Sequence, residues 1–271
     1  MCGRFALTAT PDQVTTFLGL DDIEPFPARY NIAPTQPITM VLSGAPQAPG
    51  SNRSDRSSML VRWGLIPTWV KDTRQFPLLI NARSESAAEK ASFRTAMRHR
   101  RALVPASGFY EWRQAGSRKG QAYWVRPKNG GIVAFAGLME TYAEPGGSEM
   151  DTGAIMTTSA NADIAHIHDR MPVVIHREDF SRWLDCRRQE PRAVADLLRP
   201  VEEGFSRRFR SRTSSTRSPI RVRRSRRGLS RRPTTWRSNK HRPNQRARNP
   251  EATMLIRCRY SSLSRNPRKS V

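Results

Sequence analysis

The segment Ile132-Val133-Ala134-Phe135-Ala136-Gly137-Leu138 is a continuous apolar run that follows two glycines, Gly130 and Gly131. An apolar run of this length, bounded by turn residues, is typical of a β-strand. Similar runs occupy residues 38–42, 59–63, 101–104, 122–126 and 154–158. The sequence therefore predicts a domain that is built mainly from β-strands.

Short helical segments interrupt these strands at irregular spacing. Thr10 is a suitable N-cap for a helix over residues 11–20, with Pro11 in its first turn. Helices are also predicted over residues 84–99, 177–184 and 193–198, and a Ser/Gly/Pro/Asn-rich loop over residues 43–58. This irregular order does not indicate a parallel βαβ array. We predict an α+β fold, with a mainly antiparallel sheet or barrel-like core and flanking short helices.

The positive charge of the chain is concentrated near its C-terminus. The 271 residues carry a net charge of +24, but residues 206–271 contain 22 Lys and Arg against a single acid, Glu251. We therefore predict a globular domain over residues 1–205 and an Arg/Ser-rich, disordered basic tail over residues 206–271. The domain itself has a net charge of only +3, which favours a local binding groove over a broad cationic surface.

The cysteines and histidines limit the possible compartments and metal sites. Cys2, Cys186 and Cys258 are too few and too scattered for a disulfide framework or a zinc site. Neither an apolar signal region nor an apolar run of ~18 residues is present, so we expect a cytoplasmic protein without a membrane segment. His166 and His168 would point the same way on a strand, but no third ligand is nearby. We expect neither a metal nor another cofactor.

The chain begins Met1-Cys2-Gly3-Arg4-Phe5. If Met1 is removed, Cys2 carries a free α-amine beside its thiol, and such an aminothiol condenses with an aldehyde through an imine to a five-membered thiazolidine. The amine titrates at about 7.7–8.0 and the thiol at about 8.5, so small shifts prepare either group for reaction. The alternative is that Cys2 is a small buried core residue.

Six further segments combine small, aromatic and ionisable side chains. They are Gly3-Arg4-Phe5, Arg29-Tyr30-Asn31-Ile32-Ala33-Pro34, Arg62-Trp63-Gly64-Leu65-Ile66-Pro67, Ile80-Asn81-Ala82-Arg83-Ser84-Glu85, Pro105-Ala106-Ser107-Gly108-Phe109-Tyr110-Glu111-Trp112 and Ile167-His168-Asp169-Arg170-Met171-Pro172. In this order and spacing they closely resemble the SRAP family (SOS response-associated peptidases, also called abasic-site processing proteins). The resemblance extends from Cys2 to about Phe205.

The resemblance implies an SRAP fold with Cys2 as nucleophile and with Asn81, Glu111 and His168 in the active site. It also implies binding of single-stranded DNA and a covalent thiazolidine with the ring-opened aldehyde of an abasic site. Autoproteolytic, peptidase-like removal of Met1 is implied as well. We expect a monomer that acts on single-stranded DNA with abasic sites, with peptidase-like hydrolase or lyase-like chemistry.

The residue types are consistent with these roles. Aromatic neighbours of Glu111 in the sequence would raise the pKa of its carboxyl toward the range of general acid–base catalysis. We assign His168 to proton transfer at the sugar ring oxygen and Glu111 to proton transfer at the amine and imine, while Asn81 orients the Cys2 amine or the sugar hydroxyl. The alternatives are a surface Glu111 paired with Arg113 and a core His168 satisfied by Asp169.

Arginines flank the proposed site residues in the sequence. We predict that Arg4, Arg83 and Arg170 hold DNA phosphates. Asn31 is placed with them in the DNA interface. Trp63 and Trp69 provide aromatic faces for base stacking, with core packing as the alternative for each.

The tail departs from the family pattern, which continues with a Pro-Val-Ser segment and a Val-Asn-x-Val-x-Asn segment. One explanation is a genuine basic, nucleic-acid-binding tail. We favour a reading-frame shift near Phe205 or Ser206, because codons for residues 213–220 exist whose shifted frame reads Val-Val-Asn-Lys-Val-Ala-Asn. The shift predicts a missing closing strand and a destabilised product.

Three functions are therefore compared. The first is an abasic-site sensor that forms a Cys2–DNA thiazolidine. The second is a peptidase or N-terminal-nucleophile amidohydrolase, in which Cys2 attacks an acyl group and His168 or Glu111 is the base. The third is a non-enzymatic nucleic-acid binder that acts through its basic tail.

Overall fold

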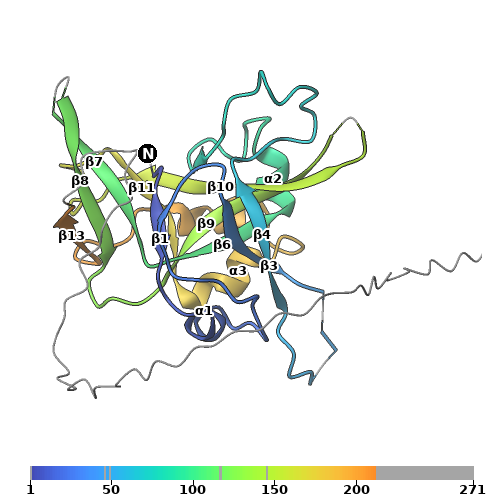
Figure 1. Ribbon diagram of the computed structural model, residues 1–271. Coiled ribbons are helices and arrows are strands. Elements are labelled where there is room, and N and C mark those ends of the chain that lie inside the picture. Colours follow the sequence, from blue (N-terminus) through green and yellow to red (C-terminus); the bar gives the residue numbers. More distant parts are fainter. Residues whose placement is uncertain (1, 46, 49, 116–117, 145, 212–271) are drawn as a thin grey trace, which may run out of the picture. The chain divides into compact units, whose positions relative to one another are not determined.

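Two β-sheets form the framework of the chain (Figure 1). The computed structural model describes residues 2–45, 47–48, 50–115, 118–144 and 146–211. All of these belong to one structural unit, Met1–Arg224. The part of the predicted tail from residue 212 onward lies outside the described residues.

The larger sheet closes on itself. Its strands are β3 (Pro37–Ser43), β4 (Arg56–Trp63), β5 (Asn81–Arg83), β6 (Arg101–Ala106), β9 (Val133–Ala143), β10 (Glu149–Ser159), β11 (Arg170–Pro172) and β12 (Val174–Ile175). The order β10-β4-β3-β6-β9 returns to β10, because β9 and β10 also pair. Most pairings are antiparallel, but β10 runs parallel to β4 and to β5. The predicted α+β fold with a mainly antiparallel, barrel-like core is confirmed.

The second sheet has five strands in the order β13-β8-β7-β1-β2, and every neighbouring pair is antiparallel. The strands are β1 (Phe5–Leu7), β2 (Arg29–Ile32), β7 (Gly108–Ala115), β8 (Arg118–Pro127) and β13 (Ser206–Arg210). Because β13 pairs with β8 along its whole length, the domain boundary predicted at Phe205 lies one strand too early. The predicted disorder is wrong for residues 206–210.

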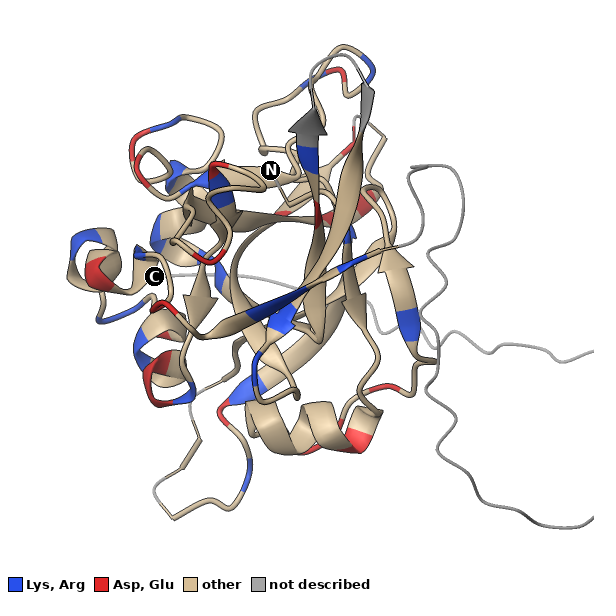
Figure 2. Cartoon of the chain, turned by 90° about the vertical axis from the view of Figure 1, so that its left-hand side faces the viewer, with Lys and Arg blue, Asp and Glu red and all other residues tan. Residues whose placement is uncertain are grey.

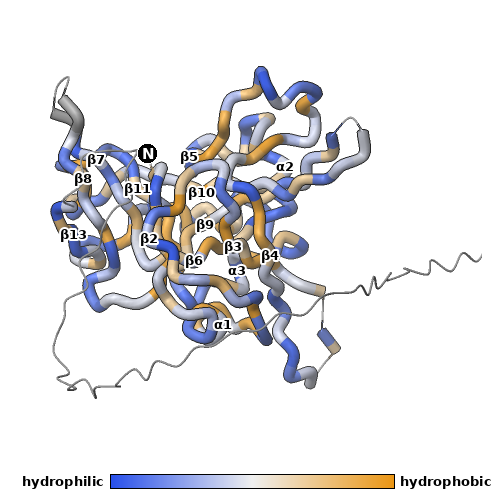
Figure 3. The backbone as a smooth tube through the Cα atoms, in the orientation of Figure 1, coloured by the Kyte–Doolittle hydropathy of each residue, from blue (hydrophilic) through white to orange (hydrophobic). Residues whose placement is uncertain are grey.

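The apolar run that begins at Ile132 lies at the centre of the molecule as β9. Hydrophobic residues concentrate on β3, β6, β9 and β10 (Figure 3). Phe135 on β9 packs its ring against Phe5 of β1 at 6.4 Å and against Phe109 of β7 at 6.1 Å. These edge-to-face contacts join the two sheets and position the strands that carry the site.

The first predicted helix is present as α1 (Pro11–Leu18). Thr10 and Gln13 form a capping box, and Gly19 ends the helix in the left-handed conformation two residues before the predicted end. The prediction over residues 84–99 is wrong for most of its length, since only α2 (Arg94–His99) is helical. Residues 84–93 form turns, and the Ser84 N–H donates to Thr157 of β10 at 2.9 Å instead of starting a helix.

The remaining predicted helices are shorter or tighter than expected. Residues 177–184 form a 3₁₀ turn, η1 (Arg177–Asp179), followed by α3 (Phe180–Leu184), and η2 (Pro191–Leu198) is a 3₁₀ segment. Within the described ranges, no helix is both long and apolar enough to span a bilayer.

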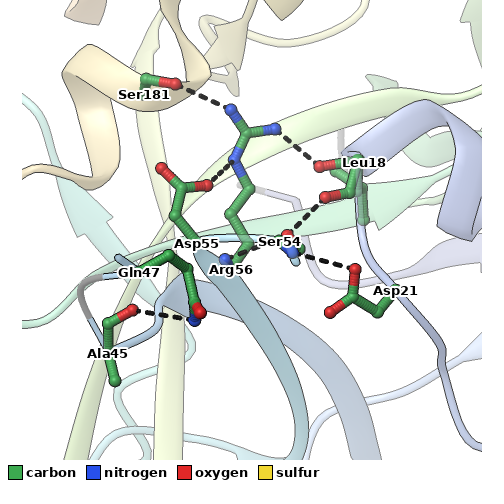
Figure 4. Close-up of polar contacts among 9 residues, drawn as sticks. Leu18, Asp21, Ala45, Gln47, Ser54, Asp55, Arg56 and Ser181 are labelled. Carbon is green, nitrogen blue, oxygen red and sulfur yellow. Dashed lines mark hydrogen bonds and ion pairs between the residues drawn. The ribbon is translucent and has the colours of Figure 1, made fainter. Parts of the chain in front are cut away.

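Arg56 at the start of β4 connects two helices (Figure 4). Its guanidinium donates to the Leu18 carbonyl at the end of α1 at 2.6 Å and to the Ser181 hydroxyl of α3 at 2.8 Å. A cation at a helix C-terminus is favourable because the carbonyl dipoles converge there. The predicted loop over residues 43–58 is correspondingly shorter, because β4 begins at Arg56.

Candidate functional site

Cys2 lies next to the strand that carries Glu111. Phe5 of β1 is paired with Phe109 of β7, and the Tyr110 N–H donates to the Arg4 carbonyl at 2.9 Å. Cys2 precedes β1, and the charge of Glu111 on β7 acts on its thiol. Cys2 is fully buried, and its thiol donates to the Arg4 carbonyl at 3.8 Å.

Glu111 is only 3% exposed, which excludes the surface acid paired with Arg113. Burial raises the pKa of the Glu111 carboxyl, and the positive charge that His168 carries when protonated opposes this shift. Burial likewise raises the pKa of the Cys2 thiol, and the charge of Glu111 raises it further. Glu111 is therefore close enough to affect the Cys2 thiol, and His168 is close enough to affect Glu111.

Asn81 is the first residue of β5, opposite Ile155 of β10. Its amide nitrogen donates to the Ile155 carbonyl at 3.4 Å, while its Oδ1 is buried and has no hydrogen-bond partner among the described residues. A buried acceptor without a partner is costly, so it marks a position where a ligand donor would be favourable. The Asn31 Oδ1 on β2 is likewise buried and has no hydrogen-bond partner among the described residues.

His168 lies between the turns of residues 161–167 and strand β11. Its Nδ1 is 3.0 Å from the Arg170 backbone nitrogen and 2.8 Å from an Asp169 carboxylate oxygen. One nitrogen cannot accept the Arg170 N–H and also donate its own proton to Asp169. We favour the first arrangement, because Asp169 is largely exposed and the backbone N–H is fixed, so the ring proton lies on Nε2. His166 is exposed on a turn, so the strand geometry considered for a metal pair is not present.

Arg170 was predicted to hold DNA phosphate, but its guanidinium already has partners. It donates to both Glu85 carboxylate oxygens, at 2.7 and 2.9 Å, and to the Thr157 carbonyl at 2.6 Å. The bidentate pair lowers the pKa of Glu85 and ties the His168 segment to the turn after β5, while the bond to Thr157 ties it to β10. Glu85 ends the fourth quoted motif, but nothing in the sequence indicates that it positions Arg170.

Two of the predicted arginines differ in environment. Arg83 is exposed at the end of β5 and, by strand alternation, lies on the same face as Asn81, with the buried Ala82 between them. Arg4 is half-buried and donates to the Gly3 carbonyl at 3.1 Å.

The two tryptophans have opposite environments. Trp63 is fully buried, donates from Nε1 to the Ile80 carbonyl at 2.9 Å and packs edge-on against Phe5 at 5.2 Å. Its prediction as a base-stacking surface is therefore wrong, and the core alternative holds. Trp69 is 55% exposed and rests against Phe76 at 5.6 Å, so its ring remains a candidate for stacking.

Comparison with known families gives one match that covers most of the chain. The model of the SOS response associated peptidase (SRAP) family matches residues 1–215. This chain belongs to the SRAP family. The family predicted from the sequence motifs is thereby confirmed.

Curated SRAP relatives carry a common name. Abasic site processing protein YoqW of Bacillus subtilis (strain 168) is 36% identical over 205 residues, covering 74% of this chain and 88% of the relative. Abasic site processing protein YedK of Escherichia coli (strain K12) is 32% identical, covering 68% and 79%. Abasic site processing protein HMCES of Gallus gallus is 29% identical, covering 64% and 58%.

Solved structures share the fold. A protein from Bacteroides thetaiotaomicron superposes with a TM-score of 0.66 at 24% identity, covering 78% of this chain and 92% of that one. A phage-related protein from Bordetella bronchiseptica gives a TM-score of 0.63 at 24% identity, covering 81% and 100%. At this level of identity the likeness concerns the SRAP fold alone.

Proposed function

We propose that this SRAP protein processes abasic sites by joining Cys2 covalently to the ring-opened sugar in single-stranded DNA. The observation that carries the proposal is the burial of Cys2, just before β1, and of Glu111 on β7, because the charge of Glu111 acts on Cys2 and that of His168 acts on Glu111. The names of the curated relatives supply the substrate class.

The chemistry requires a free α-amine on Cys2. While Met1 is attached, the Cys2 nitrogen is an amide and cannot attack an aldehyde. Hydrolysis of the Met1–Cys2 bond consumes one water, releases methionine and leaves the amine beside the thiol. Glu111 lies close enough to Cys2 to affect its ionisation, so the same carboxyl can exchange a proton with the new amine.

The first bond forms between the amine and C1′ of the sugar. His168 gives its Nε2 proton to the ring oxygen as the O4′–C1′ bond breaks. The same nitrogen takes the proton of the C1′ hydroxyl as the aldehyde appears, so the neutral imidazole is restored. The amine then adds to C1′ to give a carbinolamine. Neutral Glu111, favoured by burial, donates a proton to the carbinolamine hydroxyl, which leaves as water. The products are an iminium ion and a Glu111 carboxylate.

The second bond forms between sulfur and C1′. Because burial raises the pKa of the Cys2 thiol, the sulfur is protonated before reaction. The Glu111 carboxylate accepts the thiol proton, the thiolate adds to the iminium carbon, and the thiazolidine closes with Glu111 neutral again. One aldehyde and one aminothiol thus give one thiazolidine and one water.

The thiol pKa also separates this reaction from the peptidase alternative. An acyl-transferring cysteine needs a thiolate at the start of the reaction, and active cysteines have lowered pKa values. The Cys2 thiol is shifted in the opposite direction. A route in which the amine attacks first fits this site better.

DNA binding at this site is assigned to five polar or aromatic residues. We propose that exposed Arg83 contacts a phosphate, that Asn81 on the same face orients the sugar, and that exposed Trp69 stacks on a base. Arg4, just before β1, and Asn31 on the neighbouring strand β2 complete the proposed interface.

The test uses a single-stranded oligonucleotide with one abasic site. A heat-stable adduct with the mass of protein lacking Met1 plus DNA minus one water is expected from the full chain. Cys2→Ala should abolish it, and Cys186→Ala, at a half-buried thiol, is the matched control. An undiminished adduct in Cys2→Ala would refute the proposal, whereas peptide hydrolysis without an adduct would support the peptidase.

We further propose that residues after Phe205 derive from a shifted reading frame. In β13, every side chain after Ser206 is exposed, so the strand pairs with β8 through its backbone and its side chains need not match a core. Sequencing the locus in related strains tests this. An intact frame that encodes the same tail in those strains would exclude the shift.

A further inference from the structure

A pocket of about 1160 Å³ lies on the face of the five-stranded sheet opposite to Glu111. Side chains alternate along β7, so Phe109 and Glu111 point toward the core while Tyr110 points to the other face. Ala6 of β1 and Trp124 of β8 lie on the Tyr110 face and line this pocket. The pocket is therefore separate from the Cys2 site.

Aromatic rings form the floor of the pocket. Tyr110 and Trp124 are in contact, with ring centroids 4.6 Å apart. Phe209 of β13 stands opposite Trp124 in the strand register and is 44% exposed. Tyr30, whose backbone carbonyl accepts the Tyr110 hydroxyl at 2.9 Å, is also exposed. Exposed ring faces of this kind bind nucleobases by stacking, whatever the base.

Arginines surround these rings. The Arg126 guanidinium lies 5.2 Å from the centre of the Phe209 ring. Arg126 is also directly opposite Arg207 in the β8–β13 register, and like charges at such positions repel each other. Neither has a carboxylate partner among the residues that the structure describes. An anion between them would relieve this repulsion.

The charge of the pocket lining is unbalanced as well. Arg177 and Arg210 line it together with Arg126, and Asp12 is the single acid of the lining. Figure 2 views the molecule from the side of β8 and β13, where basic residues lie on the strands. Aromatic floor and cationic rim together match a polymer of bases and phosphates.

We propose that this pocket binds single-stranded DNA, with bases stacked on Phe209 and Trp124. Phosphates are held by Arg126 and Arg210 of the lining and by Arg207, which stands opposite Arg126 beside the pocket. The choice of DNA rests on the proposed function, but the binding itself does not require Cys2. The pocket would hold undamaged nucleotides of a strand, away from the reacting abasic sugar.

Fluorescence anisotropy with undamaged oligothymidylate and the full chain tests the proposal. Phe209→Ala should weaken binding roughly 5- to 150-fold, the effect of losing one base–aromatic stack. Leu60→Ala, at an exposed apolar residue outside the pocket, is the matched control. The basic tail is present in both variants, so its contribution cancels.

The salt dependence tests the phosphate contacts. Each lost phosphate contact reduces the slope of log affinity against log salt by about 0.7 on single strands. The double variant Arg126→Ala, Arg207→Ala should therefore reduce the slope by roughly 1.4. The control double variant Arg192→Ala, Arg199→Ala, at two exposed arginines, should reduce the slope less. Equal slopes in the two double variants would overturn the proposal.

Crosslinking locates the strand. DNA with 5-iodouracil should crosslink on irradiation to the peptides that contain Trp124 or Phe209, and a crosslink confined to residues 212–271 would overturn the proposal. Thymidine monophosphate that displaces DNA at equal concentration would also overturn it, by indicating a mononucleotide pocket.

Two variants distinguish a failure of this proposal from a failure of the proposed function. Cys2→Ala should bind undamaged DNA normally, and Phe209→Ala should still form the adduct with a short abasic oligonucleotide.

Discussion

The Cys2 thiol, just before β1, and the Glu111 carboxyl on β7 are both buried, and burial shifts the pKa of each toward the neutral form. Burial is the main cause for each, and the charge of Glu111 adds to the shift of the Cys2 thiol. Two acids that share a dry site disfavour ionisation of each other. The site therefore keeps its protons until a substrate group arrives to exchange them.

Glu111→Gln is expected to lower the rate of adduct formation about 10²- to 10⁴-fold, the usual contribution of a general acid–base group.

The same variant should also become more stable relative to wild type as the pH rises. Above the ordinary carboxyl pKa of 4.5, the unfolded chain loses the Glu111 proton while the folded chain keeps it. The folded state then binds more protons, so its stability falls with rising pH up to the folded pKa, and the glutamine variant lacks this loss.

Chemical unfolding between pH 4 and pH 9 measures this difference. The free energy of unfolding of Glu111→Gln relative to wild type should increase across this range. Glu89→Gln, at an exposed acid, serves as the control and should show no such trend. Parallel curves for wild type and Glu111→Gln would contradict the shifted carboxyl.

Cys2 is expected to react slowly with iodoacetamide at pH 8. The thiolate is the reacting species, and burial keeps the Cys2 sulfur protonated. Cys186 is half-buried and should be alkylated first. Peptide mass spectrometry over a time course measures both rates. Faster labelling of Cys2 than of Cys186 in the folded protein would contradict the described burial.

Glu85→Gln separates two roles for Arg170. If the Glu85 pair positions the His168 segment, the variant should reduce the rate of adduct formation about 10- to 100-fold at unchanged DNA affinity, since small displacements of catalytic groups are costly. If Arg170 instead binds phosphate, releasing it from Glu85 should tighten DNA binding. Parallel measurements of adduct rate and anisotropy decide between them, and Glu85→Asp should restore part of the rate by retaining the charge.

Sequence reasoning succeeded where the signal is local. The apolar run at residues 132–138 predicts β9, and Thr10 predicts the start of α1, because strand burial and helix capping depend on neighbouring residues. The closure of the barrel depends on the pairing of β9 with β10, and only the general class was predicted. The helix over residues 84–99 failed because a backbone bond to β10 replaces helical bonds at its start.

In the site, too, local motifs were predictable and contacts between distant residues were not. Motif order predicts Cys2, Glu111 and His168 as site residues. In the structure, Glu111 affects the pKa of Cys2, and His168 affects that of Glu111. Side-chain partners were not predictable, because Arg170 meets Glu85 across 85 positions of sequence. The burial of Trp63 likewise depends on its contact with Phe5 of the other sheet.

Trp63 and Trp69 give a matched pair of substitutions. Trp63→Ala should destabilise the fold by about 3–5 kcal/mol, since it empties a core position. Trp69→Ala should change stability by less than about 0.5 kcal/mol and weaken DNA binding by about 1–3 kcal/mol. Thermal unfolding and anisotropy measure the two effects. Equal destabilisation by both substitutions would contradict their opposite environments.

The corrected domain boundary predicts unequal stability for two truncated chains, one ending at Ser211 and one at Phe205. Strand β13 pairs with β8 over its length, and the Ser211 N–H donates to the Ala122 carbonyl at 2.8 Å. Loss of two or three such bonds costs ~2 kcal/mol, or about 4–8 °C in Tm for a domain of this size. The chain ending at Phe205 should therefore melt earlier in differential scanning calorimetry. Identical Tm values would show that β13 adds nothing to the sheet and would return the boundary to Phe205.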